Sequence, residues 1–119
     1  MDDKKLEGLA ALGEADLGSA LERVCGDAEL YWECLGDLFA DDDLTALKKE
    51  LEAGNVQQAF SVAHALKGVI SNLGLTALYR QICEIVEPLR AGKTEGVEDA
   101  LNLFIEQMEQ YRNYYNSMN

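Results

Sequence analysis

The chain contains a single proline, Pro88, in 119 residues, and its apolar residues recur at helical spacing over long stretches. Proline breaks helix interiors, so its near absence allows long helices to form. An apolar repeat of about 3.6 residues gives each helix one face to bury, and no stretch shows the strict alternation of a β-strand. The sequence therefore predicts an all-α protein, and it shows no internal repeat or low-complexity tract.

Glycines and capping residues divide the N-terminal half into a short helix and a long one. We expect the short helix from about Glu14 to Val24, with Gly26 as its stop signal. The long helix is expected to start near Asp27, a good N-cap residue, and to end at Gly54. The run of aspartates at 41–43 is expected to kink or interrupt it.

Three more long helices are predicted in the C-terminal half. The first is capped by Asn55 and reaches Leu73, with Gly74 as a left-handed stop. The second starts near Thr76 and must kink or end at Pro88. The third starts near Thr94 and ends in an aromatic tail of Tyr111, Tyr114 and Tyr115. Four long helices with short connections pack most simply as an antiparallel up-down four-helix bundle. We expect residues 1–119 to form one such domain, capped by the short N-terminal helix.

The overall charge narrows the classes of partner. Ten Lys and Arg against 22 Asp and Glu give a formal net charge of −12, which disfavours binding to nucleic acid or to an anionic membrane. No apolar run approaches a membrane span, and the N-terminal sequence does not read as a signal peptide. Cys25, Cys34 and Cys83 lack CxxC spacing. Reduced, buried thiols in a cytoplasmic protein are therefore favoured over a metal or redox role.

The acidic residues are unevenly distributed along the chain. Residues 53–83 contain no Asp or Glu, and their only cations are Lys67 and Arg80. His64, the only histidine, lies in the middle of this window. A buried helix would also carry few charges, but here the positions expected to be exposed are uncharged too. The window lowers the electrostatic cost of placing a dianion near His64.

A helical wheel of about 100° per residue places His64 on a polar face. The opposite, apolar face holds Val62, Leu66, Val69, Ile70 and Leu73, flanked by Ala59 and Ala63. The polar face around His64 holds Gln57, Ser61, Gly68 and Ser71, with Lys67 and Asn72 at its margins. We therefore expect an exposed imidazole near the middle of a helix spanning about residues 55–73.

Three neighbours of His64 suggest what this face does. Gly68 destabilises an exposed helix interior by roughly 1 kcal/mol relative to alanine, and its benefit would be steric access to the imidazole one turn away. Lys67 supplies a compact positive charge near a group bound to that ring. Phe60 also falls on the polar side of the wheel, where a partner-docking patch and packing against a neighbouring helix both account for it.

The residues His64, Lys67, Gly68 and Gly74 closely resemble the His-x-x-Lys-Gly core and later glycine of the histidine-containing phosphotransfer (HPt) domain family. The segment 71–75 reads like the family's continuation of this motif, and 21–31 resembles the start of its first helix. The resemblance covers roughly residues 12–110. Pro88 departs from it, since the family usually runs that helix without proline, and the tail beyond about Gln110 lies outside it.

The resemblance implies a phosphorelay intermediate of a two-component system. His64 would accept a phosphoryl group from an aspartate of a receiver domain, in a hybrid sensor histidine kinase or a response regulator, and pass it to another receiver aspartate. Lys67 would stabilise the phosphoryl charge and Gly68 would provide access. The receiver would contact Gln57, Phe60, Ser61, Ser71 and Asn72 and would supply the magnesium ion, so the chain needs no cofactor of its own.

Without a glycine-rich nucleotide loop or a second histidine, the chain is not expected to autophosphorylate, and we expect a cytoplasmic monomer. One alternative is a non-catalytic helical adaptor that binds receiver or kinase domains without phosphotransfer. Another is a hydrolase or metal enzyme that uses His64. The lack of a carboxylate at helical spacing from His64 disfavours metal binding and acid–base catalysis.

Overall fold

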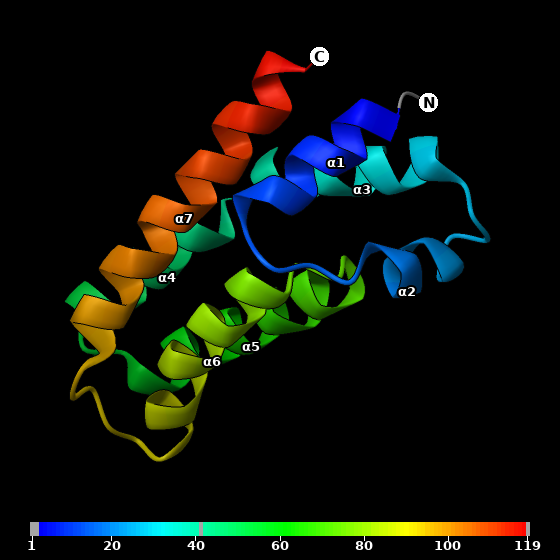
Figure 1. Ribbon diagram of the computed structural model, residues 1–119. Helices are drawn as coiled ribbons and strands as arrows, with labels where there is room; N and C mark the ends of the chain where they lie inside the picture. Colours follow the sequence, from blue (N-terminus) through cyan, green and yellow to red (C-terminus); the bar gives the residue numbers. More distant parts are fainter. Residues whose placement is uncertain (1–2, 41, 119) are drawn as a thin grey trace.

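The computed structural model describes residues 3–40 and 42–118, and these residues form helices and no strand (Figure 1). The all-α prediction is therefore confirmed. The helices are α1 (Asp3–Leu12), α2 (Leu17–Glu22), α3 (Ala28–Ala40), α4 (Asp43–Glu52), α5 (Val56–Asn72), α6 (Thr76–Arg90) and α7 (Val97–Ser117).

The long helices surround one hydrophobic core. Helix α5 packs against α4 and α6, α6 also packs against α7, and α7 packs against α3. Because α3 and α4 follow each other along the chain, these contacts close a ring of helices. Short turns join α4 to α5 and α5 to α6, and Figure 1 shows α6 and α7 running in opposite directions. The side chains fully buried at the centre include Leu35, Leu47, Ile70, Ile82, Ile85 and Phe104.

The N-terminal region differs from the prediction of one helix from Glu14 to Val24. It contains two helices instead, and α1 lies upstream of the predicted range, beside α7 (Figure 1). Contacts with distant parts of the chain stabilise α1, since Leu9 is fully buried and the Tyr114 hydroxyl donates a hydrogen bond to the Lys5 carbonyl at 2.8 Å. Helix α2 starts late because the Asp16 side chain caps it, accepting from the Ser19 N–H at 3.1 Å.

The predicted long helix from Asp27 to Gly54 is interrupted, as the aspartate run suggested. Helix α3 ends at Ala40 and α4 begins at Asp43, while Asp41 lies outside the described residues. Asp27 acts as the predicted cap, because its carboxylate accepts from the Leu30 N–H at 3.1 Å. Gly54 adopts the left-handed conformation (φ 76°) that ends α4.

Helix α6 does not end at Pro88 but continues to Arg90. A proline in the last turn removes one backbone hydrogen bond, whereas Leu89 beyond it is buried in the core. Helix α7 begins at Val97, after Gly96 in the left-handed conformation, and so starts three residues later than predicted. It continues without a break to Ser117, past the end of the expected resemblance.

The turn between α5 and α6 is fixed to the N-terminal region. Gly74 has the predicted left-handed conformation (φ 70°), and its carbonyl accepts from the Asp16 N–H at 2.7 Å. A Cβ atom at this position would collide with the backbone carbonyl of Asp16. At the other end of α5, Asn55 holds the predicted N-cap position, but its side chain donates to Glu50 (2.9 Å) and makes no capping hydrogen bond.

Candidate phosphotransfer site

Helix α5 carries the candidate site on its outer face. His64 is exposed near the middle of the helix, as predicted, and so are Gln57, Ser61, Gly68, Ser71 and Asn72. The opposite face is buried through Ala59, Ala63, Leu66 and Ile70. The separation of the two faces follows directly from the helical spacing of the apolar residues.

Of two side chains on α5, Val69 lies differently from the prediction and Phe60 follows one of its two interpretations. Val69, assigned to the apolar core face, is 43% exposed, because it stands at the edge of that face rather than at its centre. Phe60, for which a docking patch and packing against a neighbouring helix were both predicted, is half-buried. The Arg90 guanidinium of α6 lies over its ring, with Cζ 5.1 Å from the ring centroid. Phe60 thus packs against the neighbouring helix, which was one of its two interpretations.

The imidazole has an aromatic neighbour and two cations in its surroundings. The Phe60 and His64 ring centroids are 5.5 Å apart, and the planes are tilted by 38°. Lys67 is half-buried one turn further along α5 and forms no ion pair with a described residue. Arg90, which stands over the Phe60 ring, pairs with Glu87 at 3.4 Å. Arg90 could not be identified from the sequence, because no local pattern links α6 to residue 60.

Gly68 is open to its surroundings. A Cβ atom built on it would meet nothing within 4 Å outside its own helix backbone and chain neighbours. Gly8 and Gly36, which are also in helices, would instead bring a Cβ into the hydroxyls of Tyr114 and Tyr115. Close helix packing therefore explains those two glycines but not Gly68.

Residues 53–83 contain no Asp or Glu, but the fold brings acidic side chains from other segments close to them. Arg80, one of its two cations, forms an ion pair with Glu14, which lies just before α2. Glu87 of α6 also approaches the His64 side of α5 through its pair with Arg90. Of the two cations in residues 53–83, Arg80 is therefore paired, whereas Lys67 forms no ion pair with a described residue.

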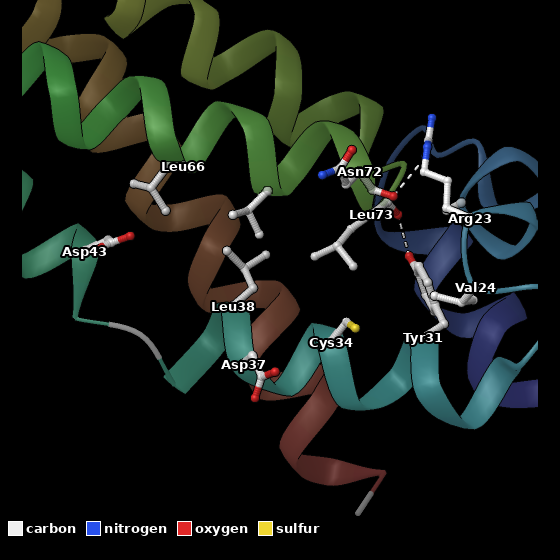
Figure 2. A pocket seen from close by; sticks show the side chains of 12 residues that line it. Arg23, Val24, Tyr31, Cys34, Asp37, Leu38, Asp43, Leu66, Asn72 and Leu73 are labelled. Carbon is white, nitrogen blue, oxygen red and sulfur yellow. Dashed lines mark hydrogen bonds between the residues drawn. The ribbon is translucent and has the colours of Figure 1, made fainter.

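A groove of about 490 Å³ lies beside α5, between it and α2, α3 and the start of α4 (Figure 2). At one end, Arg23 donates from Nη1 to the Asn72 carbonyl at 2.8 Å, and the Tyr31 hydroxyl donates to the Leu73 carbonyl at 2.5 Å. Burial is the main cause that raises the pKa of Tyr31 above its ordinary value. The other residues that line the groove include Val24, Cys34, Asp37, Leu38, Asp43, Leu66 and Val69.

Arg23 and Tyr31 satisfy carbonyl groups that the C-terminus of α5 leaves without an intrahelical partner. Neither was identified from the sequence, because contacts over more than 40 residues leave no local pattern. They fix the end of the helix that carries His64.

The cysteines differ in part from the prediction of buried thiols. All three are free, but Cys25 is exposed and in the left-handed conformation (φ 55°), while Cys34 and Cys83 are half-buried. In the part of the chain that the structure describes, no group of three His, Cys, Asp or Glu residues could hold a metal ion. None of the described helices is both long enough and apolar enough to span a membrane.

Comparison with known protein families identifies the class of this chain. The family model of the Hpt domain matches residues 39–114, and the chain therefore belongs to the Hpt domain family. The match runs from the end of α3 into α7 and includes every candidate residue on α5. It does not include segment 21–31, so the proposed likeness of that segment stays a prediction. No curated protein and no solved structure gave a significant match.

The family gives the general function. Hpt domains carry out histidine phosphotransfer in the phosphorelays of two-component signalling, where they interact with receiver domains. They are phosphotransfer modules and not kinases.

Proposed function

We propose that this chain is a phosphorelay intermediate that accepts a phosphoryl group on His64 from a receiver-domain aspartate and passes it to an aspartate of another receiver. The observation that carries the proposal is the position of His64. The histidine is exposed near the middle of α5, and the space above the following turn is open at Gly68. A flat partner surface can therefore reach the imidazole.

The transfer is an in-line substitution at phosphorus. A lone pair on a neutral imidazole nitrogen attacks the phosphorus, the P–O bond to the aspartate breaks, and the aspartate leaves as a carboxylate. The return step to a second receiver is the same reaction in the opposite sense. A magnesium ion held by the receiver would offset the charge of the transferring group, so this chain needs no cofactor.

The residues around His64 would divide the remaining tasks. Lys67, which forms no ion pair with a described residue, would stabilise the phosphoryl oxygens, and Gly68 would let the two surfaces approach. The partner would rest on the exposed side chains of α5 and on the accessible part of Phe60, with contact residues Gln57, Phe60, Ser61, Ser71 and Asn72.

The wider setting is proposed on the same basis. Residues 1–119 would form a single domain that works as a monomer in the cytoplasm and has no autokinase activity. The partners would be the receiver domains of a hybrid sensor histidine kinase, of a response regulator, or of both.

The test is transfer from a 32P-labelled phosphorylated receiver domain to the purified chain. Wild-type protein should gain acid-labile, base-stable phosphate, and His64→Gln should gain none while keeping its helicity and thermal stability. An exposed side chain contributes little to folding, so the variant should remain a valid comparison. If the wild-type protein binds the receiver but gains no label, the chain is an adaptor and the proposal fails.

A further inference from the structure

The half-buried ring of Phe60 connects His64 to a cation on another helix. The ring lies 5.5 Å from the imidazole, centroid to centroid, and the Arg90 guanidinium stands over it with Cζ 5.1 Å from its centroid. The imidazole and the guanidinium therefore both contact the same aromatic ring. Stacking on an aromatic face favours this position for an arginine.

Phe60 and Lys67 lie on opposite sides of His64 along the helix axis, and Arg90 of α6 stands over the Phe60 ring. Phe60 precedes His64 by one helical turn, and Lys67 follows it by one turn. Arg90, placed by Phe60, is thus near the N-terminal side of the imidazole, while Lys67 is near its C-terminal side. A phosphoryl group on His64 would extend anionic oxygens beyond the ring, between two positive charges.

In the unmodified protein Arg90 pairs with a carboxylate that another anion could replace. Its Nε lies 3.4 Å from a Glu87 oxygen, and the two side chains are 48% and 58% exposed. Ion pairs this exposed contribute little to stability, so separating them is easy. A phosphoryl dianion carries more charge than a carboxylate, and its oxygens match the planar fork of a guanidinium.

We propose that Arg90 is a second cation for the phosphoryl group and that it exchanges the Glu87 carboxylate for the phosphoryl oxygens when His64 is phosphorylated. This inference rests on the proposed function of His64. Glu87 then acts as a competitor that holds Arg90 on Phe60 while the histidine is unmodified. The site would combine a fixed charge on α5 with a movable charge on α6.

The experiment uses potassium phosphoramidate, a small donor that needs no receiver. The imidazole nitrogen attacks its phosphorus, the P–N bond of the reagent breaks, and ammonia leaves. NMR of 15N-labelled protein follows the Arg90 Nε–H resonance, which is assigned by its loss in Arg90→Lys. After phosphorylation this resonance should shift and exchange more slowly with solvent, and Phe60→Leu should weaken both changes.

The rate of phosphorylation at low salt gives an independent measurement. Arg90→Gln should slow the reaction with the anionic reagent about two- to threefold, and Glu87→Gln should accelerate it about twofold, with both effects disappearing at high salt. Glu84→Gln, at another exposed glutamate of α6, removes the same charge and should have a smaller effect.

The outcomes separate the two proposals. A phosphorylated His64 with an unchanged Arg90 resonance, or with equal effects of Glu84→Gln and Glu87→Gln, would overturn the exchange and leave the phosphorelay proposal intact. A wild-type His64 that takes no phosphate from phosphoramidate would overturn both. Circular dichroism melting confirms that each variant is folded.

Discussion

The substitution Gly68→Gln tests two properties of this position separately, namely the stability of α5 and the access of a partner to His64. The structure leaves space for the new side chain, since a Cβ at this position meets nothing within 4 Å. Glutamine has a higher helix propensity than glycine by roughly 0.5–0.8 kcal/mol, so the variant should be more stable. For a domain of this size that gain corresponds to a rise in melting temperature of about 2–4 °C.

Phosphotransfer should change in the opposite direction. The aspartyl phosphate of the receiver must come within about 3–3.5 Å of the imidazole nitrogen, and a side chain one turn away would hold the surfaces apart. We expect transfer to slow by about tenfold or more, which corresponds to ~1.4 kcal/mol of transition-state stabilisation. The assay is the initial rate of label transfer from a phosphorylated receiver, together with thermal unfolding of the same preparation.

Phosphorylation by phosphoramidate is the control for this variant. The small reagent does not need a flat surface, so Gly68→Gln should react with it at close to the wild-type rate. Transfer from the receiver at the wild-type rate in Gly68→Gln would refute the role of Gly68 in access. A fall in melting temperature would refute the structural premise that the position is open.

Further predictions follow from charge and from backbone geometry. Lys67→Ala should slow transfer from the receiver, with an effect that shrinks as ionic strength rises, which a salt series of transfer rates checks. Gly74→Ala should destabilise the fold by about 2 kcal/mol or more in urea unfolding, because the residue is left-handed and a Cβ would collide with the Asp16 carbonyl. Tyr31→Phe should destabilise by roughly 1–2 kcal/mol, since it leaves the Leu73 carbonyl without this hydrogen bond. Because the pKa of Tyr31 is raised in the folded state, its contribution is complete below pH 10 and is lost above it. The stability of wild type should therefore fall more steeply than that of Tyr31→Phe between about pH 9.5 and 11.

The helices with a strong apolar period could be predicted from the sequence, and so could the exposed position of His64. Both depend on local rules, namely the helical repeat and the stop signals at Gly54 and Gly74. Helix α1 could not be predicted in this way. It holds its place through Leu9 in the core and through the Tyr114–Lys5 hydrogen bond, which joins the two ends of the chain. The same kind of long-range contact places Arg23 and Tyr31 at the end of α5.

The two glycines of the motif show how residues of one type can serve different purposes. Gly74 is required by the backbone, because its left-handed conformation and the nearby Asp16 carbonyl exclude a side chain. Gly68 is in an ordinary helical conformation with open space around it, so the fold alone would accept a larger residue. The sequence predicts a left-handed stop at Gly74 and steric access at Gly68, but it does not predict that a Cβ at Gly74 would meet the Asp16 carbonyl.

The charge around His64 is a property of the assembled bundle rather than of α5. In sequence, residues 53–83 contain two cations and no acid, which lowers the expected electrostatic cost of a dianion near His64. In the fold, Glu14 pairs with Arg80, while α6 brings both Arg90 and Glu87 toward Phe60. The surface therefore has a cation that is unpaired among the described residues, Lys67, and another whose carboxylate partner is weakly held. Such an arrangement avoids an excess of positive charge when His64 is unmodified, and Arg90 becomes available when a dianion is added.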